Sequence, residues 1–322
     1  MTKHLWRTVT CNTLWRGTLL ASVFFLNLAV ARVFGAGPSG RFLFLVTNFQ
    51  LASALAGLGL DSGIQYLGAS EPGGKRELAG FVVRYAAAAA LLTALVAGVL
   101  LLLHVFDSGW MVAYAVGFVG GSLFLRFNAA LANSGRLFQL PVAVEACGNL
   151  ILIALLLALR DKQHLFFGVY FAMPLVCGGV VRAYLPLEPG PKTQPSLRRL
   201  WRYSAQAFAA NLVFFAVYRV DYWWVAAYCS AGELGNYIQA AKLAQLFFFL
   251  PQVIAMVIFP DIVQGVGGIH PGTIRRLMRQ IAGLYVLILV PFLFYGRALL
   301  ACVLGPGTGF GSTSTEGCWR SA

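Results

Sequence analysis

Seven charged residues lie inside long apolar stretches of the sequence, where a charge is costly. The cations are Arg16, Arg126, Arg219 and Lys242, and the acids are Asp61, Glu145 and Asp221. Within a membrane-spanning segment, such a side chain needs a water-filled cavity or a partner of opposite charge. The cations could bind an anion, because a guanidinium binds phosphate through paired hydrogen bonds and an ammonium acts as a point charge. The acids could serve as counter-charges or take up a coupling proton or sodium ion.

Each of these charges also has a purely structural interpretation. Arg16 lies near the end of its apolar stretch, and its long side chain can snorkel to the membrane surface, as can that of Lys242. Asp61 can be a polar residue at a helix end or pair with a neighbouring arginine, and Arg126 can pack between helices. Glu145 can pair with a nearby cation instead of carrying a proton. The sequence leaves these alternatives open.

Arg219 and Asp221 form the segment Tyr-Arg-Val-Asp-Tyr-Trp-Trp with their neighbours. Two residues apart on a helix, their side chains point roughly 200° away from each other, so they do not pair. One is expected to line a cavity while the other meets a neighbouring helix. Trp223 lies one turn beyond Arg219, and this spacing predicts a cation–π contact between the two.

The composition is that of a membrane protein. Of the 322 residues, 59% are hydrophobic and 11% are charged, and the mean hydropathy is +0.75. Apolar stretches of about twenty residues recur, each long enough to cross ~30 Å of hydrocarbon. The sequence therefore predicts an all-α polytopic membrane protein. Nine spans are expected, at 12–34, 41–69, 80–106, 110–133, 139–159, 164–184, 202–227, 234–260 and 280–303.

The formal net charge of +13 reflects the loops between these spans. In a soluble protein it would suggest nucleic acid, but in a membrane protein loop cations set the topology, and no nucleic-acid partner is expected. Loops on the N-terminal side of the membrane hold most of the lysines and arginines. The other side holds Arg32, Arg41, Arg160, Lys162 and Arg297. The positive-inside rule therefore predicts a cytoplasmic N-terminus.

Two lobes are predicted from the longest connection and from an internal repeat. Residues 185–201 are rich in proline and separate six spans from three, so we expect an N-terminal lobe at 1–184, a cytoplasmic linker at 185–201 and a C-terminal lobe at 202–305. Gly-Pro-Ser-Gly-Arg-Phe (37–42) resembles Gly-Glu-Leu-Gly-Asn-Tyr (232–237) at an offset of 195 residues. We interpret the glycines as forming a tight turn, with the aromatic at the membrane interface. Repeats of equal topology would be related about an axis along the membrane normal.

Cysteines and enzyme motifs point to no catalytic or metal chemistry. The six cysteines contain no Cys-x-x-Cys pair and most lie in apolar spans, where we expect them to be small apolar side chains. No phosphate-binding loop, dinucleotide fingerprint or His-Glu-x-x-His motif occurs in the sequence. We therefore expect no cofactor, no metal site and no enzymatic activity.

Two hairpins resemble a known family. Residues 31–68 carry the Gly-Pro-Ser-Gly-Arg-Phe segment and run into Gly-Leu-Gly-Leu-Asp-Ser-Gly. Residues 218–262 carry Arg-x-Asp before a turn, Gly-Asn-Tyr after it, and Phe-Pro at the end of the next span. Both resemble the corresponding hairpins of the Wzx-type flippases for polysaccharide and O-antigen, members of the MATE-like MOP superfamily. The resemblance covers about residues 10–305.

This resemblance implies a two-lobed, MATE-like helical bundle around a central cavity. It implies alternating-access transport of undecaprenyl-diphosphate-linked oligosaccharide across the bacterial inner membrane for lipopolysaccharide or other polysaccharide export, with membrane lipids and polysaccharide-assembly proteins as partners. Arg16, Arg126, Arg219 and Lys242 would then face the diphosphate.

The end of the chain departs from the family pattern. Family members have about twelve or more spans, whereas the segment 306–322 is polar and rich in glycine, serine and threonine. We expect a truncated or frame-shifted product with an incomplete second lobe. The alternative is a genuine variant with a short polar tail.

Three alternatives to a flippase remain open. A cation-coupled multidrug exporter of the MATE type would rely more on intramembrane acids. A membrane O-antigen polymerase or ligase needs a large outer loop, whereas the outer loops expected here are about five residues long. An inactive truncated fragment is the third alternative.

Overall fold

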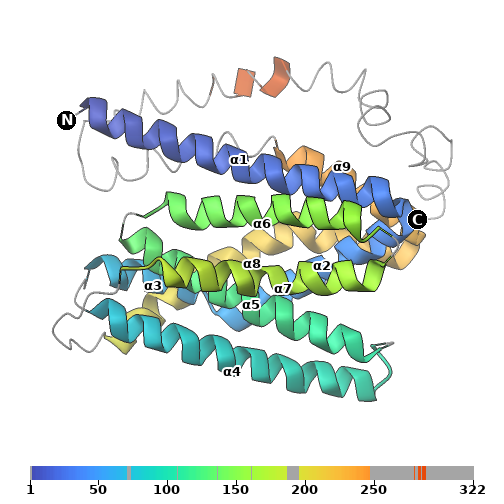
Figure 1. Cartoon of the computed structure of the whole chain (residues 1–322), viewed down its shortest axis with the longest axis horizontal. Coiled ribbons are helices and arrows are strands. Elements are labelled where there is room, and N and C mark those ends of the chain that lie inside the picture. The colour runs from blue at the N-terminus through green and yellow to red at the C-terminus, as the bar shows by residue number, and fades with distance from the viewer. Residues whose placement is uncertain are drawn as a thin grey trace. The chain divides into compact units, whose positions relative to one another are not determined.

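The computed structural model describes residues 2–70, 74–106, 108–135, 137–160, 162–186 and 196–246, with a few positions between 279 and 287. The regular elements in these ranges are helices (Figure 1). They are α1 (Thr2–Phe34), α2 (Ala36–Gly57), α3 (Leu60–Ser70), α4 (Lys75–Leu102), α5 (Gly109–Ser134), α6 (Gln139–Ala158), α7 (Gln163–Ala183), α8 (Leu197–Tyr228) and α9 (Ala231–Leu246).

The chain is an all-α polytopic membrane protein. Among the described residues, 5 helices are long and apolar enough to cross a membrane, and α2 with α3 supplies a sixth span if the bent pair is counted as one. These segments coincide with the first six expected spans, and α8 covers the seventh. The expected span at 280–303, apart from isolated positions, and the tail at 306–322 lie outside the described residues, as does most of the linker at 185–201.

The chain divides into two compact units, which are described separately. One comprises residues 1–14, 30–43 and 224–322, and is called unit 1 here. The other comprises residues 15–29 and 44–223, and is called unit 2.

Helix α5 is the centre of unit 2, packed against α3, α4 and α7. Its adjacent glycines make this possible, because a Cβ on Gly121 would lie 2.7 Å from the backbone nitrogen of Leu175 in α7. A Cβ on Gly120 would lie 2.9 Å from that of Ala90 in α4. Small residues let membrane helices approach closely, and van der Waals packing then holds them together. The core of this unit contains Leu60, Ile64, Leu67, Leu78, Val82, Val119, Leu123, Phe127 and Leu200.

The second expected span, 41–69, is formed by two helices with a bend between them. Helices α2 and α3 meet at 49°, where Leu58 and Gly59 have φ of 48° and 69°. The carbonyl of Ser204 in α8 lies where a Cβ of Gly59 would project, so glycine meets both the backbone conformation and the close approach. The Tyr85 hydroxyl of α4 donates to the Ala56 carbonyl at 2.7 Å and pairs a polar group beside the break.

In unit 1, the repeated glycine motifs lie inside helices, so their interpretation as tight turns was wrong. The turn before α2 is made by Gly35, with φ of 77°, and Gly40 packs inside α2 against α9. Phe42 is buried, so it is a core residue in place of an interfacial one. Glycine serves turns and helix contacts equally well, and the motif alone does not distinguish them.

A capping box begins α9. The backbone N–H and the hydroxyl of Ser230 each donate to Glu233 Oε2 at 2.8 Å, and the Glu233 N–H donates to Ser230 Oγ at 3.3 Å. This reciprocal pairing satisfies N–H groups that the first helical turn leaves open. The Ser230 backbone N–H, and then its hydroxyl, hold the pKa of Glu233 below its ordinary value.

Candidate functional site

Two of the cations singled out from the sequence lie within electrostatic range of one acid in unit 2. Arg16 lies on α1, Arg126 on α5 and Glu145 on α6, and the carboxylate of Glu145 interacts electrostatically with both cations. The two arginine side chains are exposed at the protein surface, whereas Glu145 is partly buried. These three residues are called the charge cluster below.

A polar contact next to the charge cluster ties α1 to α6. The Asn149 side-chain amide donates to the Ser22 hydroxyl at 3.0 Å, and this hydroxyl donates to the Leu19 carbonyl at 2.7 Å. Asn149 lies one helical turn beyond Glu145 on the same side of α6. The hydrogen bond therefore holds α1 beside α6 one helical turn from Glu145.

Helix α7 approaches α6 on another side of Glu145. A Cβ on Gly148 would lie 2.8 Å from the Cys177 sulfur, and the Cys177 thiol donates to the Val144 carbonyl at 3.8 Å. Cys177 is buried and carries a free thiol, as expected for a small apolar side chain. Cys229 differs from that expectation, because it is disulfide-bonded. The apolar sequence around Cys229 does not indicate that this cysteine forms a disulfide.

The charge cluster has the chemistry of an anion site with a built-in counter-charge. Two guanidinium groups and one carboxylate leave an excess of one positive charge. Guanidinium groups bind phosphate oxygens bidentately, and they do so more strongly where water is partly excluded. Glu145 meanwhile offsets the cost of holding two cations in a largely apolar bundle when no anion is bound.

Arg219 and Asp221 on α8 are both held by Tyr222. A nitrogen of the Arg219 guanidinium donates to the Tyr222 hydroxyl at 2.7 Å, and the guanidinium carbon lies 5.1 Å from the ring centroid. The predicted stacking of Arg219 on Trp223 was therefore wrong, since Arg219 lies over the ring of Tyr222, its i+3 neighbour. Trp223 instead donates from its indole to Asn48 Oδ1 of α2 at 2.9 Å. Asp221 Oδ1 accepts from the Tyr222 backbone N–H at 3.1 Å.

The other two candidate residues lie elsewhere. Asp61 is in the first turn of α3, just past the bend, and is partly buried. Lys242 is a partly buried residue of α9 in unit 1. Among the described residues, no group of three histidine, cysteine, aspartate or glutamate side chains has the arrangement of a metal site.

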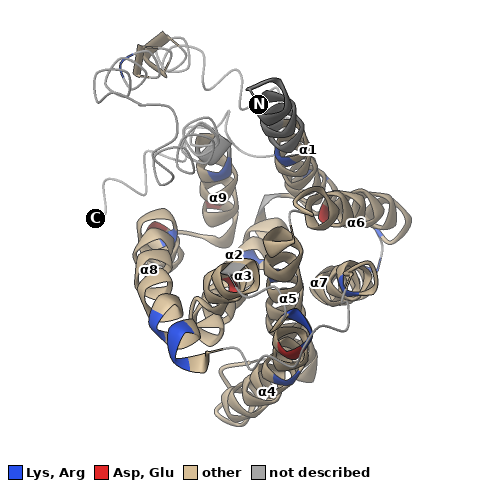
Figure 2. Cartoon of the chain, turned by 90° about the vertical axis from the view of Figure 1, so that its left-hand side faces the viewer, with Lys and Arg blue, Asp and Glu red and all other residues tan. Residues whose placement is uncertain are grey.

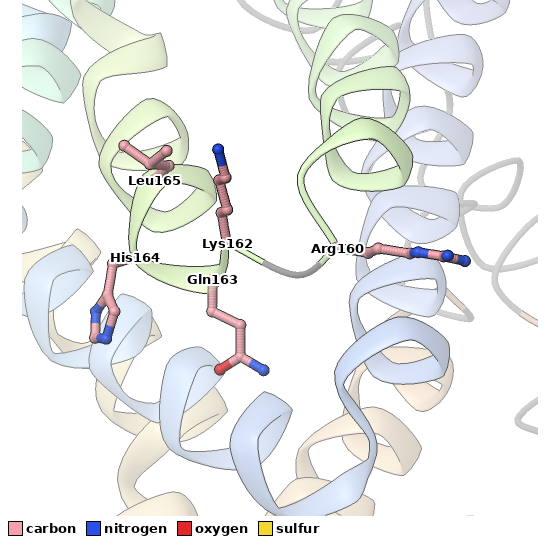
Figure 3. Close-up of a pocket in the computed structure, with 5 residues that line it drawn as sticks. All are labelled: Arg160, Lys162, Gln163, His164 and Leu165. Atoms are coloured by element: carbon pink, nitrogen blue, oxygen red, sulfur yellow. The ribbon is translucent and has the colours of Figure 1, made fainter.

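A shallow depression of ≈ 600 Å³ lies at the connection between α6 and α7, lined by Arg160, Lys162, Gln163, His164 and Leu165. Figure 3 shows that the Arg160 side chain extends away from Lys162, and that His164 points in yet another direction. Because these side chains diverge, the depression does not offer the convergent donors of an anion site. From the sequence, Arg160 and Lys162 are expected to be loop charges only.

The polar residues next to the charge cluster were not predicted from the sequence. Ser22 and Asn149 are small polar residues within apolar stretches, and Asn149 follows Glu145 by four positions. Polar residues one turn apart in a membrane span are a usable signal, because they share a helix face that must meet another polar group.

Residues 171–305 match the model of a family described as "Polysaccharide biosynthesis protein". The match begins in α7 and includes α8 and α9. No curated protein and no solved structure matches the chain. The chain is thus a multi-pass membrane protein that is similar, over this segment, to polysaccharide biosynthesis proteins.

Proposed function

We propose that this protein is a flippase that moves undecaprenyl-diphosphate-linked oligosaccharide across the bacterial inner membrane by alternating access. The charge cluster carries the proposal: Arg16 on α1 and Arg126 on α5 both interact electrostatically with the partly buried Glu145 on α6. The similarity of residues 171–305 to polysaccharide biosynthesis proteins supports a glycan-linked role. The activity is transport, with no covalent step, and the proposed orientation has the N-terminus in the cytoplasm.

The diphosphate is the part of this substrate that is most costly to move through the membrane without the protein. Its charges are costly to desolvate, whereas the polyprenyl tail remains soluble in lipid. Arg16 and Arg126 would bind the phosphate oxygens as water is lost, and Glu145 would then give up its two cationic partners. Uptake of the coupling proton or sodium ion by Glu145 would keep its carboxylate from being left as an unpaired charge in the membrane.

A translocation assay tests the proposal. The full chain is placed in liposomes with a fluorescent polyprenyl-diphosphate oligosaccharide, and the fraction moved between leaflets is followed over time. Replacing both arginines (Arg16→Gln with Arg126→Gln) should slow translocation at least about tenfold, since each lost charge-assisted pair is worth roughly 1.5–3 kcal/mol. The matched control, Arg160→Gln with Lys162→Gln, removes two cations at the divergent depression and should leave the rate unchanged.

An unchanged rate in the Arg16 and Arg126 variant, at equal folded protein, would sink the proposal. A rate lost equally in both double variants would also count against it, because overall charge would then explain the effect. Replacing the glycan by a cationic dye in the same liposomes separates this function from multidrug export. Dye transport that persists without Arg16 and Arg126 would favour the exporter.

Coupling to a proton or sodium gradient is the second part of the proposal, with Glu145 as the coupling group. Glu145→Gln keeps the shape of the side chain and removes its charge. The variant should translocate at a rate that no longer responds to an imposed pH or sodium gradient. If the parent responds and the variant responds equally, Glu145 is not the coupling group.

A further inference from the structure

One end of unit 2 gathers cations on two helix starts. They are Lys75 and Arg76 at the beginning of α4, and Arg198, Arg199 and Arg202 in the first two turns of α8. Leu78 of α4 and Leu200 of α8 belong to the same core cluster, so the two helices begin at the same end of the unit. Figure 2 views the chain from that side, and blue ribbon marks the near end of α8.

The first turns of α8 have a packed side and an outward side. Leu200 and Ser204 are fully buried, and the Ser204 hydroxyl lies where a Cβ of Gly63 in α3 would project. At about 100° per residue, Arg198 and Arg202 share a helix face nearly opposite these two. Both arginines are exposed, so they point away from the helix bundle.

Aromatic and apolar side chains flank this outward side. Trp201 is 42% exposed and Leu197 is 52% exposed. The two residues are one helical turn apart, so they are neighbours on the surface of α8. On the other flank, Tyr203 stacks on Tyr66 of α3 with ring centroids 4.7 Å apart and planes at 7°. Exposed Trp and Tyr beside cations are typical of the membrane–water interface, where the ring contacts lipid and its polar edge meets headgroups.

We propose that this outward side, formed by Arg198, Trp201 and Arg202 and called the arginine face, binds the headgroups of anionic phospholipids such as phosphatidylglycerol. Each guanidinium group can bind a phosphate bidentately, and Lys75 and Arg76 add electrostatic attraction at the same end. Trp201 and Leu197 contact the upper acyl chains of the same lipids. This inference does not depend on the transported substrate, and it concerns a surface away from the charge cluster.

Native mass spectrometry of the purified full chain in neutral detergent measures lipid binding directly. Phosphatidylglycerol and phosphatidylcholine with identical acyl chains are titrated separately, and bound lipids are counted. We expect phosphatidylglycerol to bind in preference. Replacing Arg198 and Arg202 together by glutamine should weaken its binding about thirty-fold, given roughly 1 kcal/mol for each cation near a lipid surface.

The matched control is again Arg160→Gln with Lys162→Gln, which removes two cations from a different helix connection. It should leave the affinity for phosphatidylglycerol within about twofold of the parent, and neither variant should change the weak binding of phosphatidylcholine. The proposal is overturned if the Arg198 and Arg202 variant binds phosphatidylglycerol like the parent, or if the control weakens binding as much. Displacement of the lipid by an equal concentration of inorganic phosphate would also overturn it, because the face would then be an ion site.

Discussion

Gly40 of α2 packs against Gly235 of α9, and the two are equivalent positions of the repeat, 195 residues apart. A Cβ on Gly40 would lie 2.7 Å from the Gly235 Cα and 2.5 Å from the carbonyl oxygen of Ala231. Ala231 is in turn the repeat equivalent of Ala36. Contact between equivalent positions is the pattern made by segments related by a two-fold axis. The sequence repeat therefore has a physical counterpart inside unit 1.

The first prediction separates Gly40 from the first glycine of each motif. Gly40→Ala should destabilise the protein by about 1–3 kcal/mol, because the added methyl group meets the backbone of Ala231 and Gly235, which cannot move aside cheaply. Gly37→Ala and Gly232→Ala are the controls, since no atom lies within 4 Å of a Cβ at either position. Thermal unfolding in detergent, followed by loss of monodisperse protein, gives the comparison. A loss for Gly40→Ala no larger than that of the two controls would contradict a packing role for Gly40.

The second prediction concerns the hydrogen bond between Ser22 and Asn149. A double-mutant cycle with Ser22→Ala and Asn149→Ala should give a coupling free energy of about 0.6 kcal/mol, the average for such bonds between membrane helices. The same substitutions should slow the proposed translocation, because they loosen α1 and α6 beside the charge cluster. Thr93→Val is the control: its hydroxyl donates to Ala89 within α4 at 2.7 Å and joins no second helix. Purely additive effects of Ser22→Ala and Asn149→Ala would rule out the coupling.

The third prediction concerns Tyr222, which is fully buried and accepts the hydrogen bond from Arg219. Tyr222→Phe keeps the ring and removes the hydroxyl, so the partly buried guanidinium of Arg219 loses an acceptor at a cost of about 1–3 kcal/mol. Arg219→Gln in the Tyr222→Phe background should then cost less than Arg219→Gln alone. The free energy of unfolding of the four proteins provides the test. A Tyr222→Phe protein as stable as the parent would mean that the guanidinium finds another acceptor.

The fourth prediction is a pH dependence of the α9 cap. Because the pKa of Glu233 is lowered in the folded protein, the carboxylate stabilises the fold at pH values above the unfolded pKa near 4.5. This contribution is lost as the pH falls through the lower, folded pKa. The melting temperatures of the parent and of Glu233→Gln should therefore differ at pH 7 and converge in acid. Ser230→Thr keeps the cap and should follow the parent; a gap between parent and Glu233→Gln that widens in acid would contradict the assignment.

The sequence allowed the membrane class and the approximate positions of the described helices to be predicted, because twenty-residue apolar stretches dominate hydropathy. The bend at Leu58 and Gly59 could not be predicted, since hydropathy contains no information on backbone torsion angles. The partner of Arg219 was missed because i+3 and i+4 neighbours are both within reach on a helix, and packing around Tyr222 decides between them. Which charges meet was equally hidden: Arg16, Arg126 and Glu145 are brought together only by the order of helices in the bundle.

The bend between α2 and α3 has a consequence for how the protein is made. The carbonyl of Ala56 is paired by the Tyr85 hydroxyl, and Gly59 fits against the backbone of Ser204 and Phe208. A chain emerging from the ribosome presents Ala56 well before Tyr85, and Ser204 much later. The bent span is therefore synthesised before α4 and long before α8, and an unpaired carbonyl in hydrocarbon is unfavourable. Its native shape is therefore completed by helices that arrive afterwards: insertion of the early hairpin and the setting of its angle are separate events in biogenesis.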